Sequence, residues 1–203
     1  MTEAQEPLDE RTVDPDPLAQ FGRWFDRAAT VTASPEAMAV ATADSEGRPS
    51  VRMLLLKSWG EDGFTFFTNY DSSKGHQLAD NPHASLLFFW EPLGRQVRIE
   101  GPADRTSAEE SDAYFATRHR ESQVGAHASR QSRPIESRQA LDRQVGEFEA
   151  EFAGRPVPRP PWWGGVRITP SSFEFWQQRD HRLHDRLRYT PDGEGWSITR
   201  LQP

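Results

Sequence analysis

The alternation of apolar and polar positions in the first half of the chain predicts short strands around a few helices. Leu18, Phe21, Trp24 and Phe25 recur at helical spacing, which predicts an amphipathic helix over about residues 17–30. Short apolar runs bounded by turn residues predict strands. These strands cover residues 37–43, 51–59, 64–69, 84–90 and 96–103, and a short helix from Ser72 or Ser73 to Asp80 precedes the fourth.

The second half begins with helices and ends with strands. Ser107 and Glu110 have the spacing of a capping box, which predicts a helix to about Arg118. A second helix is predicted over 136–152, and strands are predicted over 165–168, 172–177, 183–189 and 196–201. The fold class is therefore mainly β (α+β), an antiparallel barrel with flanking helices. We expect one domain over residues 17–203, preceded by an acidic, proline-rich, flexible arm at 1–16.

Composition narrows the function classes. The net charge of −7 argues against general nucleic-acid binding, which needs a basic surface. The absence of cysteine excludes disulfides, thiolate metal sites and a cysteine nucleophile. No apolar run approaches the roughly 20 residues of a membrane helix, and the acidic N-terminus does not read as a secretion signal. We therefore expect a cytoplasmic protein.

Only two of the 24 basic residues are lysines, Lys57 and Lys74. The apolar run from Arg52 to Lys57 has a cation at each end, an arrangement that suits an anionic group at the rim of a strand. Lys74 follows two serines at a predicted helix N-terminus, where free N–H groups favour phosphate. The alternative interpretations are ordinary strand-edge charges and a capped surface helix.

Two further patterns suggest an aromatic phosphate ester as ligand. Tyr114, Arg118 and Ser122 are four residues apart, so a continuous helix would place them on one face; a solvated helix face is the alternative. Arg182 and His184 would alternate along a strand beside Trp176, facing a planar anionic ligand. A metal site is not predicted, because no carboxylate converges on the histidines.

Taken together, these residues resemble the pyridoxamine 5′-phosphate oxidases, which are FMN enzymes with a split-barrel fold. The similarity spans about residues 17–203 and rests on ordered segments at compatible spacing. These are RMLLLK at 52–57, FFTNYDSSKGHQ at 66–77, SLLFFW at 85–90, RQVRIEG at 95–101, YFATRHRESQ at 114–123, SRQS at 129–132, PPWWGG at 160–165 and FEFWQQRDHRLHDR at 173–186.

The resemblance implies roles for individual residues. FMN is the implied cofactor and would lie at the interface of a homodimer. No metal, nucleic acid or membrane is implied. The implied FMN-binding residues are Arg52, Met53, Leu54, Leu55, Leu56, Lys57, Phe67, Thr68, Ser73, Lys74, Gln96, Gln131, Ser132, Trp176 and Arg186. The implied substrate-binding residues are Lys57, Tyr114, Arg118, Ser122, Arg182 and His184, of which Arg182 and His184 would be catalytic.

The implied reaction oxidises pyridoxamine 5′-phosphate or pyridoxine 5′-phosphate to pyridoxal 5′-phosphate, with oxygen as acceptor and hydrogen peroxide as product. Two alternatives stay open. One is a same-fold FMN oxidase acting on another substrate, such as a phenazine precursor. The other is a non-catalytic module that binds FMN or pyridoxal phosphate.

Overall fold

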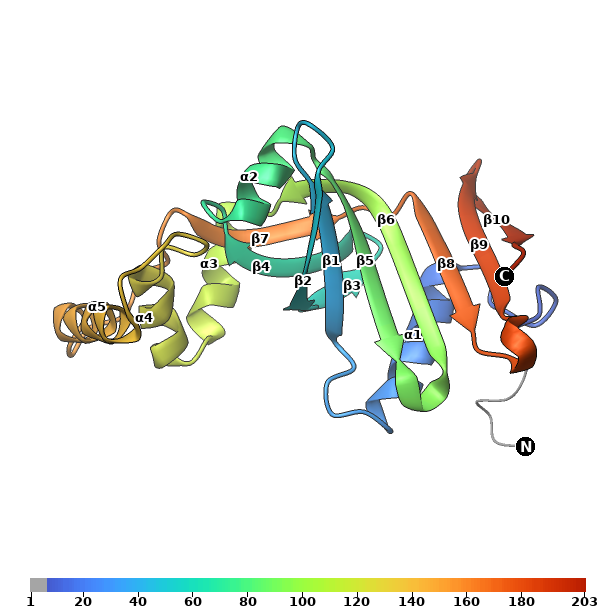
Figure 1. Ribbon diagram of the computed structural model, residues 1–203, viewed down its shortest axis with the longest axis horizontal. Coiled ribbons are helices and arrows are strands. Elements are labelled where there is room, and N and C mark those ends of the chain that lie inside the picture. Colours follow the sequence, from blue (N-terminus) through green and yellow to red (C-terminus); the bar gives the residue numbers. More distant parts are fainter. Residues whose placement is uncertain (1–6) are drawn as a thin grey trace.

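The computed structural model describes residues 7–203 and shows antiparallel strands with a group of helices at one end (Figure 1). Its helices are α1 (Pro17–Ala29), α2 (Ser73–Asp80), α3 (Ala108–Thr117), α4 (Arg120–Ala128) and α5 (Arg138–Glu151), with short 3-10 turns η2 (Glu91–Leu93) and η3 (Asp180–Arg182). Its strands are β1 (Ala37–Ala43), β2 (Pro49–Leu55), β3 (Ser58–Gly60), β4 (Gly63–Asn69), β5 (His83–Trp90), β6 (Arg95–Arg105), β7 (Trp163–Ile168), β8 (Ser172–Gln177), β9 (Asp185–Asp192) and β10 (Gly195–Arg200).

The strands close into a barrel through antiparallel pairs. β1 pairs with β2 and β5, β5 with β6, β6 with β7, and β7 with β4. The remaining gap is bridged after β2, where the Lys57 N–H donates to the Thr65 carbonyl at 2.9 Å. Closure of this kind leaves few unpaired strand edges. The antiparallel barrel with flanking helices that the sequence predicts is confirmed.

Strand β6 belongs to two sheets. Its first part, 95–100, pairs with β8, whereas residues 103–105 pair with β7. Gly101 lies at the change of partner, and a side chain there would collide with the Thr169 carbonyl oxygen. The sheet β8–β9–β10 therefore extends away from the barrel, at the opposite end of the molecule from α3–α5 (Figure 1).

Helix α1 supplies the centre of the main core. Asp16 caps its N-terminus by accepting from the Leu18 N–H, and its apolar face carries Phe21 and Trp24 into the barrel. Phe21 is fully buried and its ring lies within 6.0 Å of four other barrel-core rings, those of Trp59, Phe64, Phe88 and Trp90. A smaller cluster that includes Phe115, Val124, Phe152 and Trp163 packs beneath α3–α5.

The structure describes part of the segment that the sequence predicts to be a flexible arm, residues 1–16. Residues 1–6 lie outside the described part of the chain. Residues 7–16 contact the body of the protein: the Leu8 side chain is buried in the main core, and the Tyr189 hydroxyl donates to the Asp14 carbonyl at 2.8 Å. This half of the arm is attached to β9 rather than loose.

Most predicted elements appear within a few residues of their expected bounds. The exception in the first half is the predicted strand 51–59, which the structure divides into β2 and β3 with Leu56 and Lys57 between them. Among residues 7–203, no helix is long and apolar enough to cross a membrane.

Replacing Phe21 by alanine tests how much the packing of α1 inside the barrel stabilises the fold. Because the phenyl ring is completely enclosed by other aromatic rings, Phe21→Ala should lower the free energy of unfolding by about 3–5 kcal/mol. Urea denaturation followed by tryptophan fluorescence measures this. Val31→Ala, at an exposed position, is the control and should change stability little. Equal stabilities for the two variants would contradict the packing described above.

Candidate functional site

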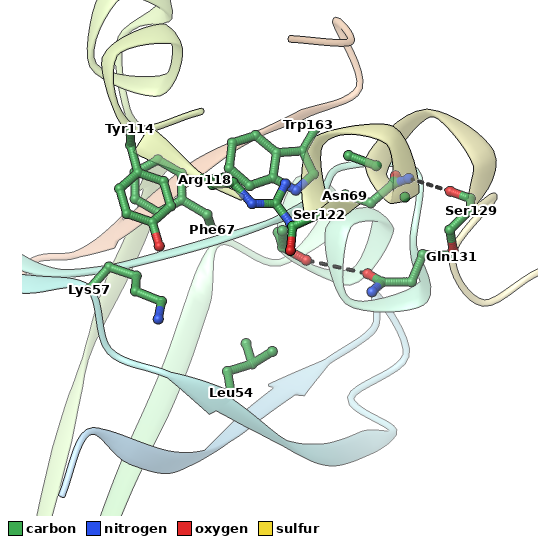
Figure 2. A pocket seen from close by; sticks show the side chains of 13 residues that line it. Leu54, Lys57, Phe67, Asn69, Tyr114, Arg118, Ser122, Ser129, Gln131 and Trp163 are labelled. Carbon is green, nitrogen blue, oxygen red and sulfur yellow. Dashed lines mark hydrogen bonds between the residues drawn. The ribbon is translucent and has the colours of Figure 1, made fainter. Parts of the chain in front are cut away.

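A cavity of about 370 Å³ lies between the barrel wall and helices α3 and α4 (Figure 2). Strands β2, β4 and β7 contribute one side of it, and the helices with the loop after α4 contribute the other. It is lined by Leu54, Lys57, Phe67, Thr68, Asn69, Tyr114, Arg118, Ser122, Gly125, Ala126, Ser129, Gln131 and Trp163. Eight of these thirteen residues are among the predicted site residues, so the fold brings most of the predicted phosphate-binding groups together.

Lys57 stands at the barrel side of this cavity. Its backbone is fixed by the hydrogen bond to Thr65 that bridges β2 and β4, so the side chain leaves the strand edge toward the helices. Figure 2 shows the Lys57 ammonium group and the Tyr114 hydroxyl directed into the same space. An ammonium and a phenol on opposite sides of a cavity can bind one anionic oxygen each.

Stacked aromatic rings form the wall that carries Arg118. Phe67 stacks on Tyr114 with ring centroids 3.9 Å apart, and on Trp163 at 5.3 Å. The Arg118 guanidinium lies over the Trp163 ring, 4.6 Å from its centroid. Burial lowers the pKa of Arg118 below its usual value. Its Nη1 is buried and has no hydrogen-bond partner within residues 7–203, which leaves a charged donor available for an anion.

The helix predicted to end at about Arg118 does end there, so Tyr114, Arg118 and Ser122 do not share one continuous helix. Helix α3 ends at Thr117, Arg118 is extended (φ −74°, ψ 148°), and α4 begins at Arg120. Side chains satisfy the terminal carbonyls: the Thr117 hydroxyl donates to Tyr114 O, and Gln123 Nε2 donates to Phe115 O at 2.9 Å. The chain turns here, and the three predicted residues still line the same cavity.

Lys74 is buried next to two residues that line the cavity, Thr68 and Gln131. Its Nζ donates to Thr68 Oγ1 at 2.9 Å, to Ser72 Oγ at 3.1 Å and to Gln131 Oε1 at 2.7 Å. All three partners are neutral, so the charge is not balanced by a carboxylate among the described residues. Burial, together with the positive charge of Arg52, lowers the pKa of Lys74 to about 8. A buried, uncompensated ammonium is what an anionic ligand group would neutralise.

Arg52 provides a second uncompensated cation. Its guanidinium donates to Thr42 Oγ1 at 2.7 Å and to Ser50 Oγ at 2.6 Å. Gln77 Oε1 accepts from both hydroxyls and from Arg52 itself. Burial lowers the pKa of Arg52 from its usual value. Lys74 and Gln77 are three residues apart on α2, so they lie on the same face of the helix. Through Gln77 this face holds Arg52, and one turn earlier it carries Lys74.

The other predicted FMN residues near these strands lie at different places. Met53 and Leu55 point outward from β2 and are 65% and 44% exposed, whereas Leu56 is buried in the main core. Ser73 is exposed at the first turn of α2. Ser132, in left-handed backbone (φ 70°), lines a neighbouring cavity of about 990 Å³ beside α5. Within this chain none of these five side chains lines the first cavity.

Three predicted FMN residues form a row across the extended sheet. The register pairs Gln96 of β6 with Trp176 of β8, and Trp176 with Arg186 of β9. Arg186 Nε donates to Glu174 Oε1 at 2.7 Å, and its charge is shared in an ion-pair cluster with the nearly buried Glu174. The adjacent residues on these strands, Val97, Phe175 and Leu187, are buried in the main core, so the row faces the other way. Strands β8 and β9 lie at the opposite end of the molecule from α3 and α4, which line the cavity (Figure 1).

The predicted alternation of Arg182 and His184 along a strand is wrong, because both residues precede β9. Asp180–Arg182 forms the turn η3, closed by the Leu183 N–H to Asp180 O, and β9 starts only at Asp185. His184 Nδ1 accepts from the Arg179 N–H at 3.2 Å, and its ring lies 4.5 Å from Trp176. Arg182 is exposed. His184 thus lies beside Trp176, as expected, but neither His184 nor Arg182 lines the cavity of its own chain.

Sequence reasoning missed several residues of the cavity. Trp163 was part of a recognised segment without a role, yet it carries Arg118. Asn69 Nδ2 donates to Ser129 O at 3.4 Å, which ties the loop after α4 to β4. Gly125 and Ala126 leave room for a ligand along α4. The small residues at three-to-four spacing from Ser122 were the signal that was available for the last pair.

Comparisons with known proteins identify the family. A family model described as "Pyridoxamine 5'-phosphate oxidase" matches residues 25–151, and one described as "Pyridoxine 5'-phosphate oxidase C-terminal dimerisation region" matches residues 163–203. Pyridoxine/pyridoxamine 5'-phosphate oxidases of Rubrobacter xylanophilus and Paraburkholderia phymatum are each 57% identical. Each match covers 97% of this chain, with 91% and 93% of the respective relative.

Solved structures agree on the fold. The chain is similar to PhzG from Burkholderia lata in complex with tetrahydrophenazine-1-carboxylic acid, with a TM-score of 0.87, 35% identity, and coverage of 100% of this chain and 97% of that one. A pyridoxamine 5'-phosphate oxidase-related, FMN binding protein from Nostoc punctiforme has a TM-score of 0.71 at 17% identity, with 91% and 96% of the two chains covered. The chain is an enzyme of the pyridoxamine 5'-phosphate oxidase family, with the split-barrel fold.

Proposed function

We propose that this enzyme uses FMN to oxidise pyridoxamine 5'-phosphate or pyridoxine 5'-phosphate to pyridoxal 5'-phosphate, with oxygen as acceptor and hydrogen peroxide as product. The observation that carries the proposal is the buried, unpartnered Nη1 of Arg118 beside Lys57, Tyr114 and Ser122. Four donors around one cavity suit a phosphate monoester. The names of the relatives support the same substrates.

The part of the site around Lys74 fits the phosphate of FMN. Lys74 and Arg52 are held by neutral oxygens alone, so a bound phosphate would balance charges that the described chain leaves uncompensated. Thr68 and Gln131 add further polar groups at the same place. When bound, the flavin would accept hydride from the substrate and pass the electrons to oxygen. The protein contributes position and electrostatics.

We infer that two copies of the chain complete each site. Residues 163–203 match a dimerisation region, and the outer face of β2 and β5 exposes Val51, Met53, Leu55 and Phe89. Such an apolar patch is typical of an interface. Docking of this face on a second copy would bring the row of Gln96, Trp176 and Arg186, with Arg182 and His184, to the cavity of the partner. The cavity draws on both hydrophobic clusters, so we also propose one domain over residues 17–203.

In this arrangement the contacts with the phosphate, far from the reacting carbon, fix the position of that carbon. Lys57, Tyr114, Arg118 and Ser122 hold the phosphate, so the ring can lie in only one orientation over the flavin. Arg182 would orient the substrate and stabilise negative charge near the reacting carbon. His184 would orient the ring or assist proton movement through its Nε2–H, because its Nδ1 accepts from the Arg179 N–H and the hydrogen of the neutral ring is therefore on Nε2.

The likeness to PhzG favours a second candidate, oxidation of a phenazine precursor. Phosphate dependence separates the two. A carboxylate offers fewer acceptor oxygens than a phosphate monoester, so a phenazine-carboxylic acid would leave more of the donors around the cavity unused, the buried Arg118 Nη1 among them. We favour the phosphate ester because unpaired buried donors disfavour a ligand that cannot use them.

Anaerobic mixing with substrate tests the proposal directly. The FMN-loaded enzyme should lose its flavin absorption when pyridoxine 5'-phosphate is added, and air should restore it with formation of pyridoxal 5'-phosphate. Unphosphorylated pyridoxine is the matched control and should bleach the flavin far more slowly. Retention of full absorption by enzyme with FMN bound would exclude the proposed reaction.

Removing the unpartnered guanidinium tests the phosphate site. Arg118→Ala should raise the KM for pyridoxine 5'-phosphate roughly tenfold or more, because a charge-assisted hydrogen bond to the phosphate is lost. Steady-state peroxide production measures this. Arg143→Ala, an exposed arginine on α5, is the control. If both variants keep the KM of the original enzyme, the phosphate binds elsewhere.

The pKa of Lys74 predicts how FMN affinity depends on pH. Burial lowers this pKa to about 8 in the FMN-free protein, so the ammonium is charged at pH 7 and mostly neutral at pH 9. FMN affinity should therefore fall about tenfold between these pH values, since the phosphate stays doubly charged. Titration of flavin fluorescence measures it. Lys74→Gln should bind FMN more weakly, with affinity independent of pH over this range; a pH-independent original enzyme would refute the assignment.

A further inference from the structure

The turn that precedes β9 is strained. His181 and Arg182 both adopt left-handed backbone (φ 56° and 62°), a conformation that residues other than glycine rarely adopt. Two such residues in succession persist only where the surrounding structure holds them, and such strain is concentrated at functional positions. The contacts that flank the turn therefore decide how Arg182 and His184 are presented.

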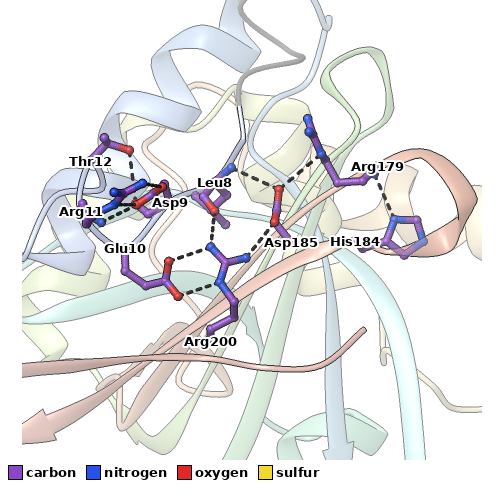
Figure 3. A network of polar contacts seen from close by, with 9 residues as sticks. All are labelled: Leu8, Asp9, Glu10, Arg11, Thr12, Arg179, His184, Asp185 and Arg200. Carbon is purple, nitrogen blue, oxygen red and sulfur yellow. Dashed lines mark hydrogen bonds and ion pairs between the residues drawn. The ribbon is translucent and has the colours of Figure 1, made fainter.

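Asp185, the first residue of β9, connects the turn to two other segments, β10 and the N-terminal segment (Figure 3). Its carboxylate accepts from Arg200 Nη1 of β10 at 2.8 Å and from the Leu8 N–H at 3.3 Å. It also forms an ion pair with Arg179 Nε at 3.5 Å, on the far side of the turn. The side chain is only 17% exposed, so these contacts are sheltered from water.

Arg200 joins this carboxylate to the N-terminal segment. Its guanidinium reaches both Glu10 oxygens, at 2.6 and 2.7 Å, and the Leu8 carbonyl at 2.8 Å. The contact lowers the pKa of Glu10 below its usual value. The Leu8 side chain is in turn buried in the main core, which fixes the segment to the barrel. The chain of contacts thus runs from the core through Leu8, Arg200 and Asp185 to both ends of the turn.

We propose that Asp185 is a positioning residue that holds the strained 179–184 turn in the conformation that presents Arg182 and His184. Asp185 is itself held by Arg200 and the Leu8–Glu10 segment, and we call this set of contacts the clasp. The inference rests on the proposed function, because it takes the turn to act at the site. Asp185 is not a catalytic residue: its oxygens are occupied by Leu8, Arg179 and Arg200. Docking of the N-terminal segment is thereby coupled to the geometry of the turn.

Two variants weaken the clasp at different distances from the turn. Asp185→Asn keeps the shape of the side chain and removes its charge. Glu10→Gln acts only through Arg200, on a half-exposed residue whose replacement leaves the core intact, so it remains informative if Asp185→Asn fails to fold. Asp142→Asn is the matched control, because it removes a comparable carboxylate from an exposed ion pair with Arg138 at 2.8 Å.

The first measurement is tryptic cleavage after Arg179 and Arg182 in the FMN-loaded protein, followed by mass spectrometry. Asp185→Asn should speed this cleavage at least about fivefold and Glu10→Gln by less, since one lost charge-assisted contact shifts the opening equilibrium by about that factor. Cleavage after Arg138 should be unchanged, and Asp142→Asn should leave the turn as protected as before. Unaltered cleavage of the turn in both clasp variants would overturn the proposal.

The second measurement separates positioning from general stability. Asp185→Asn should lower kcat with little change in KM, and this effect should disappear when Arg182→Ala is already present, because the two residues act through one turn. If Arg182→Ala lowers kcat but Asp185→Asn does not, the positioning role is wrong and the proposed site stands. If Arg182→Ala leaves kcat unchanged, the catalytic role of the turn falls, and the positioning role with it.

Discussion

The division of β6 between two sheets is the constraint on which the rest of the molecule depends. One strand pairs with β5 along one edge, while its other edge pairs with β8 over residues 95–100 and with β7 over 103–105. The change of partner needs Gly101, because any side chain there would meet the Thr169 carbonyl. The barrel side carries the cavity, and the extension carries Trp176 and the turn before β9. Both parts of the site are thus rigidly attached to one strand, yet face different ways.

Charge is distributed to match this division. The chain is acidic overall, but within residues 7–203 the cations around the cavity have no carboxylate partners. In the extension the opposite holds: Glu174 pairs with Arg98 and Arg186, and Asp185 with Arg200. Cations at the cavity are left for an anionic ligand, whereas those of the extension stabilise the sheet and its turn. A buried cation without a carboxylate partner costs stability, so a group of such cations is typical of a binding site.

The sequence predicted the elements better than the joints between them. Strands and helices follow local periodicity, so α1, α2 and the antiparallel barrel could be predicted from the sequence. The two motifs that contain Lys57 and Lys74 indicated an anion site. The new helix that begins soon after Thr117 could not be predicted, because the break between α3 and α4 depends on the side chains of Thr117 and Gln123, which donate to carbonyls of the last turn of α3. The turn at His181 and Arg182 could not be predicted either. Its left-handed backbone is held through Asp185, whose partners Leu8 and Arg200 are far away in the sequence. Spacing identified the chemistry, and tertiary contacts decided the geometry.

The placement of the cavity and the turn at opposite ends of one chain has a genetic consequence. In the dimer we propose, each site takes its phosphate-binding groups from one copy and Arg182 and His184 from the other. A copy altered at Arg118 and a copy altered at Arg182 would then each be impaired alone, yet a mixed dimer would contain one site with both intact halves. Two recessive alleles of this gene, one in each half, would complement each other within the same protein.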